Sequence, residues 1–235
     1  MWRFKNREQA GQYLAAQLLQ YASAPSTIVL GLPRGGVVVA SEVARKLSLP
    51  LDVFLVRKLG IPGYEELAMG AIASGGVRVM NENILRQISI SDDAIEAVAG
   101  REEQELRRRE QAYRGNRPRL DVKNLAVILV DDGLATGATM RAAVTALRRQ
   151  QPLRIVIAVP TAAPDTCNQF RAEVEDIICG MTPTPFQAVG AWFEDFSQTT
   201  DEEVQQLLRT AQRAKESRGR NCRIDKDSTS GLITY

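Results

Sequence analysis

Two adjacent carboxylates and a loop of small residues form the part of the chain best suited to chemistry. Asp131 and Asp132 follow an apolar run at residues 125–130 and precede the loop 133–139. The unbroken apolar run predicts a strand buried on both faces, as in a parallel sheet. Apolar residues then recur at helical spacing, so a helix is predicted to begin in the loop: Met140, Ala143, Val144 and Leu147.

Such a loop could bind a phosphate group beside a sugar. The first N–H groups of a helix have no partner within it, and together with the helix dipole they bind anions. Gly137 lets the backbone approach a ligand, Thr136 and Thr139 add hydroxyl donors, and the carboxylates could accept hydrogen bonds from vicinal sugar hydroxyls. The alternative is an ordinary strand–turn–helix junction with turn and cap aspartates. A Walker A loop is excluded, because its Gly-Lys-Ser/Thr ending is absent.

A second glycine-rich loop, GLPRGG at residues 31–36, follows the β-branched segment 27–31. Gly35 and Gly36 free backbone N–H groups, and the planar guanidinium of Arg34 suits a diphosphate. The alternative is a plain strand-to-helix turn in which Arg34 is a solvated charge.

A basic pair, Arg57 and Lys58, ends the predicted strand 51–57. The pair could stabilise charge that develops on a leaving group. It could equally be an exposed pair at a strand end.

Composition limits the class of protein. A chain of 235 residues with 44% hydrophobic residues is long enough for one α/β domain with an elaboration, or for two small domains. The net charge of +2 makes no general case for nucleic-acid binding. No apolar run approaches the roughly 20 residues that span a membrane, and the polar start is unlike a signal peptide.

The types of side chain that are missing or scarce narrow the chemistry. The chain has no histidine, which excludes a Ser-His-Asp triad, a Cys-His pair and a His-ligated metal. Acid–base catalysis would have to use Asp, Glu, Lys, Tyr or a substrate group. The three cysteines, Cys167, Cys179 and Cys222, are widely spaced, which favours a reducing cytoplasm over a disulfide framework.

The periodicity along the chain predicts an α/β fold with a parallel sheet flanked by helices. We expect a single domain at residues 1–215, an inserted flap and helix at about 61–118, and a polar tail at 216–235. The other predicted helices span residues 6–21, 37–47, 164–172 and 200–213, the last with a capping box at Thr200 and Glu203; the other predicted strands span 67–74, 77–85, 154–159, 176–181 and 186–193.

The predicted helix at residues 91–114 is highly charged. Its glutamates alternate with arginines, a pattern typical of a solvated face with local ion pairs. An RNA or partner surface is the alternative for its arginines and those that follow: Arg107, Arg108, Arg109, Arg114, Arg117 and Arg119.

These motifs together resemble type I phosphoribosyltransferases, whose signature is an apolar strand, two acids and a Thr-Gly-x-Thr loop. The resemblance extends from GLPRGG to EDFSQTTDEE and is closest to bacterial predicted phosphoribosyltransferases of unassigned substrate, which share LPRGG, VRKLG, VDDGLATGAT and FSQTTDEE. It implies that phosphoribosyl pyrophosphate (PRPP) and a nitrogenous base are the substrates and pyrophosphate a product. Mg²⁺ would be carried with PRPP or pyrophosphate, and no protein metal site is implied.

The resemblance also implies roles for residues. Asp131 and Asp132 would hold the ribose hydroxyls. Arg34, with the amides of Gly35 and Gly36, would hold pyrophosphate, and a cis peptide is expected at Pro33–Arg34. Arg57 and Lys58 would assist the leaving group. The loop that would cradle the 5′-phosphate consists of Gly133, Leu134, Ala135, Thr136, Gly137, Ala138 and Thr139.

The acceptor end of the site is less defined. A small hood near the C-terminal segment would place Trp192 or Phe193 on the base, although both could be ordinary core aromatics. Ala135 stands where hypoxanthine-guanine enzymes carry an aspartate, which argues against a 6-oxopurine acceptor of that kind. No general base is assigned; Glu65 and Glu66 are candidates. The rival function is a PRPP-binding regulator without turnover. Nucleic acid and membranes are not expected partners, and a homodimer is compatible with the sequence.

Overall fold

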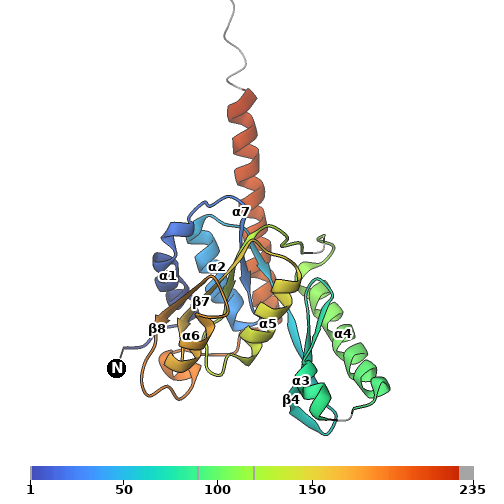
Figure 1. Ribbon diagram of the computed structural model, residues 1–235. Helices are drawn as coiled ribbons and strands as arrows, with labels where there is room; N and C mark the ends of the chain where they lie inside the picture. The colour runs from blue at the N-terminus through green and yellow to red at the C-terminus, as the bar shows by residue number, and fades with distance from the viewer. Residues whose placement is uncertain (1, 89, 119, 228–235) are drawn as a thin grey trace, which may run out of the picture.

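The computed structural model describes residues 2–88, 90–118 and 120–227 (Figure 1); the side chains at 65, 66, 83, 215 and 218–227 lie outside this description. A five-stranded parallel sheet forms the centre, in the order β2-β1-β6-β7-β8. This confirms the predicted fold class. Its strands are β1 (Thr27–Gly31), β2 (Leu51–Val53), β6 (Ala126–Val130), β7 (Arg154–Thr161) and β8 (Asp176–Met181).

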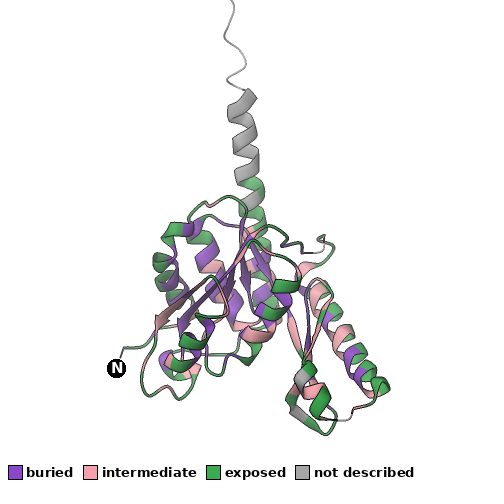
Figure 2. Ribbon diagram, in the orientation of Figure 1, coloured by how far each residue is buried: buried purple, intermediate pink, exposed green. Residues whose placement is uncertain are grey.

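Helices cover both faces of this sheet, which is why its strands are mostly apolar. Side chains on one face of the sheet, such as Val29 and Ile128, pack with helices α1 (Arg7–Gln17), α2 (Gly35–Leu47) and α7 (Asp201–Asp227). Side chains on the other face, such as Leu30 and Leu129, pack instead with α5 (Ala138–Arg149) and α6 (Pro164–Phe170). Figure 2 shows the central strands β1, β6 and β7 mostly buried between these layers, whereas the edge strand β8 is largely intermediate.

A second, antiparallel sheet projects from the core (Figure 1) and, together with two helices, forms the expected excursion. It contains β3 (Val56–Ile61), β4 (Tyr64–Ala73) and β5 (Val77–Met80), followed by helices α3 (Glu82–Gln87) and α4 (Asp92–Arg114).

Two boundaries in this region were predicted wrongly. The expected strand 51–57 is two strands in different sheets, separated at Phe54 and Leu55. Both of these residues are buried, so the apolar run continues through the break. The expected strand 77–85 ends at Met80, because Asn81 caps α3 by accepting a hydrogen bond from the N–H of Ile84.

The C-terminal part also differs from expectation. Residues 186–193 do not form the predicted strand: they contain a 3₁₀ turn at Val189–Trp192, and Phe193 forms only an isolated bridge with Phe4. The capping box is confirmed, since Thr200 and Glu203 exchange backbone-to-side-chain hydrogen bonds. Helix α7 nevertheless continues to Asp227, well beyond the predicted end at residue 213. Within the described residues no helix is long and apolar enough to cross a membrane.

The cysteine expectation is corrected as well. Cys167 on α6 and Cys179 on β8 form a disulfide. These two positions lie 12 residues apart, and spacing alone does not define a pairing. The cysteine pattern therefore gives no support to a reducing compartment.

Candidate functional site: two loops at the sheet edge

The two glycine-rich loops meet where the strand order of the sheet reverses. β1 pairs with β2 on one side and with β6 on the other, so the loops after β1 and β6 leave the same edge in opposite directions. Ligands of open α/β sheets bind in the crevice at such a switch point. The two loops are pressed together: a Cβ on Gly36 would lie 2.8 Å from Asp131 Cα, and one on Gly35 would overlap the Asp132 carboxylate.

Both loops lead into the N-terminus of a helix. α2 begins at Gly35, and the expected cis peptide at Pro33–Arg34 is confirmed. α5 begins at Ala138, after Gly137 at φ +75°, in the left-handed region that favours glycine. The first N–H groups of both helices, which have no partner within their helix, therefore lie at this edge of the sheet and could bind an anion.

Helix α6 packs against the predicted phosphate loop, residues 133–139. The Thr166 hydroxyl donates a hydrogen bond of 2.6 Å to the carbonyl of Ala135. A Cβ on Gly137 would lie 2.7 Å from Phe170 Cε2, so no larger residue fits there without displacement. Leu134 differs from the rest of the predicted loop: it is buried, and its N–H donates to the carbonyl of Thr161. Leu134 thus anchors the loop, and the residues exposed to a ligand are Ala135, Thr136, Ala138 and Thr139.

The twin aspartates are held at unusual electrostatic cost. Burial raises the pKa of Asp131 well above the usual range of a carboxyl, and the charge of Asp132 raises it further. Burial also raises the pKa of Asp132, which Arg7 opposes by hydrogen bonding and by its charge. Two desolvated carboxylates side by side are costly to a fold, and this suits a site that binds a partner rich in hydroxyl donors or positive charge.

Arg7 is a site residue that the sequence analysis missed. It is the first residue of α1, and its Nε donates to Asp132 Oδ2 at 2.7 Å. The two residues are 125 positions apart, and a lone arginine at the start of an amphipathic helix carries no local signal.

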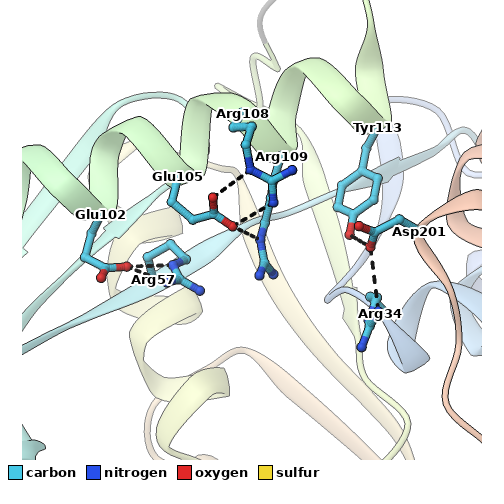
Figure 3. Close-up of polar contacts among 8 residues, drawn as sticks. All are labelled: Arg34, Arg57, Glu102, Glu105, Arg108, Arg109, Tyr113 and Asp201. Atoms are coloured by element: carbon cyan, nitrogen blue, oxygen red, sulfur yellow. Dashed lines mark hydrogen bonds and ion pairs between the residues drawn. The ribbon is translucent and has the colours of Figure 1, made fainter.

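The three predicted cationic residues do not lie together. Figure 3 shows Arg57 near the middle of α4, beside Glu102, and Arg34 near the C-terminal end of the same helix. Arg57 donates from Nε and Nη2 to Glu102, at 2.7 and 2.6 Å, and Lys58 is exposed beside it. Arg34 Nη1 lies 3.9 Å from Asp201 Oδ1.

Tyr113 completes the set of contacts around Arg34. Its hydroxyl donates to Asp201 Oδ1 at 2.5 Å. Burial raises the pKa of Tyr113 well above the ordinary value of a phenol, and the hydrogen bond to Asp201 adds to the rise. Tyr113 therefore remains a donor at neutral pH. The face of α4 thus positions Arg57 directly and Arg34 through Asp201.

The predicted base platforms lie in a buried aromatic cluster. Trp192 is 5% exposed and stacks on Phe186, and Phe193 is 3% exposed between Phe4 and Phe196. This environment favours the core alternative for both rings. The hood still reaches the phosphate loop, since a Cβ on Gly133 would overlap the Val189 side chain. The side chains of Glu65 and Glu66, the candidate general bases, lie outside the described residues.

The arginines proposed for a nucleic-acid surface are occupied by acidic partners. Arg107 pairs with Glu103, and Arg108 and Arg109 share Glu105. Arg114 and Arg117 both pair with Asp52. Arg119 lies outside the described residues. Arg107, Arg108 and Arg109 therefore form local ion pairs, which favours the solvated-face interpretation for this stretch. Arg114 and Arg117 instead reach a largely buried carboxylate on β2.

Comparison with known proteins places this crevice in a family. The model of the family described as "Phosphoribosyl transferase domain" matches residues 3–177, more than half of the chain. MT0597 of Mycobacterium tuberculosis (strain CDC 1551 / Oshkosh), named provisionally as a phosphoribosyl transferase, is 43% identical over 210 residues, covering 89% of this chain and 47% of that protein. Rv0571c of the H37Rv strain, named in the same way, matches to the same extent. The chain thus spans about half the length of these curated relatives.

One solved structure matches this fold over most of the chain. The crystal structure of TT1426 from Thermus thermophilus is 44% identical, with a TM-score of 0.76, and the match covers 88% of this chain and 97% of that one. The family match includes both glycine-rich loops and the twin acids, which come directly before the second loop. The chain belongs to the phosphoribosyl transferase domain family.

Proposed function

We propose that the chain transfers the 5-phosphoribosyl group of PRPP to a nitrogenous base and releases pyrophosphate. The observation that carries the proposal is the meeting of the two anion-binding loops at the switch point, with Asp131 and Asp132 between them. A molecule with a phosphate at one end, a diphosphate at the other and vicinal hydroxyls between matches this order of groups. The reaction breaks the bond between C1 of the ribose and the pyrophosphate oxygen and forms a bond from C1 to the base nitrogen.

The residues would divide the work as follows. Asp131 and Asp132 accept hydrogen bonds from the ribose hydroxyls, and the amides at the start of α5 hold the 5′-phosphate. Arg34 and the amides of Gly35 and Gly36 hold the diphosphate, where charge accumulates as the bond breaks. Arg57 and Lys58, on β3, would add positive charge at the leaving group.

Mg²⁺ fits this site as a cation carried by the substrate. It binds oxygen ligands and commonly takes most of them from substrate phosphates and water. Among the described residues no group of three or more His, Cys, Asp or Glu side chains could hold a metal by itself. The ion would neutralise charge on the diphosphate, while the residues of the chain orient the ribose and the leaving group.

The direct test is a panel of nitrogenous bases incubated with the protein, PRPP and Mg²⁺, with pyrophosphate release as the readout. At least one base should give release that depends on Mg²⁺ and falls in Lys58→Ala or Arg57→Ala. PRPP binding without release for any base would instead favour the regulator.

Nucleic-acid binding separates the two functions further. We expect Arg107→Ala, Arg108→Ala and Arg109→Ala together to leave PRPP affinity unchanged, because Glu103 and Glu105 already partner these side chains. A regulator that used this helix would bind RNA or DNA in a steeply salt-dependent way, and the triple variant would lose that binding. Filter binding at two salt concentrations checks this.

Arg34 should discriminate between the two anionic ends of PRPP. We expect Arg34→Ala to weaken pyrophosphate binding by roughly 10-fold or more, the loss of one charge-assisted contact, and to change ribose 5-phosphate binding little. Arg45→Ala is the matched control, because Arg45 lies on α2, the helix that begins directly after Arg34, and pairs with Glu42 at the surface. Equal losses for both ligands by calorimetry would place Arg34 elsewhere in the site.

A further inference from the structure

One arginine from the N-terminal helix joins three parts of the crevice. Arg7 Nε donates to Asp132 Oδ2, and Arg7 Nη1 donates to the carbonyl of Ser197, each at 2.7 Å. The guanidinium also lies over the ring of Phe196, 3.8 Å from its centroid. A Cβ on Gly35 would lie 2.6 Å from Arg7 Nε, so the diphosphate loop borders the same group.

This contact is unlike the surface ion pairs elsewhere in the chain. The side chains of Arg7 and Asp132 are only 12% and 17% exposed, whereas Arg107 and Glu103 are 73% and 44% exposed. Exposed pairs contribute little, but removing one partner of a buried pair leaves an uncompensated charge. The guanidinium is also fixed on both sides, by the Phe196 ring and by the Ser197 carbonyl, so its position is determined before any ligand arrives.

The bond leaves Asp132 able to act on a ligand. A carboxylate has two oxygens with about four lone-pair sites, and Arg7 uses one of them. The hydrogen bond fixes the rotation of the carboxylate relative to Asp131, whose Oδ1 accepts from the N–H of Asp132. An acceptor held in this way loses less entropy when it binds a hydroxyl pair.

We propose that Arg7 is a positioning residue for ribose binding: it orients Asp132 towards the ribose hydroxyls and ties that carboxylate to the hood at Phe196 and Ser197. This inference rests on the proposed function. Arg7 acts on the Asp132 carboxylate and, through it, on the phosphoribosyl half of the substrate. The diphosphate has its own contacts at Arg34, Gly35 and Gly36.

The test compares two ligands that report the two halves separately, ribose 5-phosphate and pyrophosphate, by titration calorimetry. Arg7→Met keeps an unbranched side chain on Phe196 but removes the fork of donors. We expect it to weaken ribose 5-phosphate binding by roughly 10-fold or more and pyrophosphate binding by less than about 2-fold. Arg7→Lys, which keeps the charge and one donor, should recover part of the loss. Arg3→Met, at an exposed arginine four residues earlier, should behave as wild type.

Other outcomes are equally decisive. If Arg7→Met binds ribose 5-phosphate as wild type does, or loses affinity for both ligands equally, Arg7 does not have the proposed role. The proposed function still stands in that case, provided that the wild-type protein binds both ligands. Wild-type protein that binds neither ligand overturns both. If Arg7→Met does not fold, Phe196→Leu and Arg7→Lys carry the test, since each should weaken ribose 5-phosphate selectively; a loss shared by both ligands contradicts the proposal.

Discussion

Replacing both twin acids, Asp131→Asn with Asp132→Asn, should abolish PRPP binding while the protein stays folded. Each carboxylate is expected to accept hydrogen bonds from ribose hydroxyls, and a bond to a charged group contributes about 1.5–3 kcal/mol. Loss of two such contacts predicts a decrease in affinity of at least about 100-fold. The amides are nearly the same size as the acids and leave the crevice open.

Titration calorimetry with PRPP and Mg²⁺ measures this effect, and thermal unfolding establishes that the variant is folded. Pyrophosphate alone is the internal control, because its proposed contacts lie on the other loop. A folded double variant with wild-type affinity for PRPP would show that the two acids do not bind the ribose.

The raised pKa values of these acids make a related prediction for the wild type. Burial and mutual repulsion raise the pKa of Asp131, so its carboxyl becomes protonated above the usual aspartate pKa of about 3.9. A protonated carboxyl is a poorer acceptor. PRPP affinity should therefore decrease as the pH falls, beginning at a higher pH than an ordinary aspartate would give.

Gly36→Ala should have the second large effect, because it separates the two loops. The added Cβ would lie 2.8 Å from Asp131 Cα and 2.9 Å from the carbonyl oxygen of Val130. Both are backbone atoms, at the last residue of β6 and the residue after it, and they cannot rotate away as a side chain could. Overpacking of this kind costs about 1–3 kcal/mol, and PRPP affinity should fall with it because α2 is displaced from the twin acids.

Gly100→Ala is the matched control for this substitution. Gly100 lies within α4, and a Cβ there would meet no atom within 4 Å. The same chemical change should raise the free energy of unfolding by roughly 0.5–1 kcal/mol, because glycine is costly within a helix. Denaturant unfolding measures both variants. A Gly36→Ala protein as stable as wild type, with unchanged PRPP binding, would show that the loops are not in close contact.

The sheet and both loops were predictable because their signals are local. An unbroken apolar run such as residues 126–130 can only be buried on both faces, and a glycine pair after a strand marks a turn into a helix. The same local reasoning fails where an apolar run continues through a break. Phe54 and Leu55 are as buried as the strands on either side of them, so nothing in the run marks the change from one sheet to the other.

The parts that were missed depend on distant contacts. Arg7 meets Asp132 only because α1 packs beside the sheet edge, and no spacing in the sequence records that. The partners of Arg57 and Arg34 likewise come from α4 and α7. The start of α3 at Asn81, by contrast, was predictable, because an asparagine followed by an acidic residue is typical of a helix N-terminus. The β-branched residues before Asn81 favoured a longer strand instead.

A crystal structure of the wild-type protein with PRPP and Mg²⁺ would test the central claim most directly. We expect ribose hydroxyls within hydrogen-bonding distance of Asp131 and Asp132. The 5′-phosphate should lie on the amides at the start of α5, and the diphosphate on Arg34, Gly35 and Gly36. PRPP bound elsewhere, or bound with the twin acids facing away from the ribose, would contradict it.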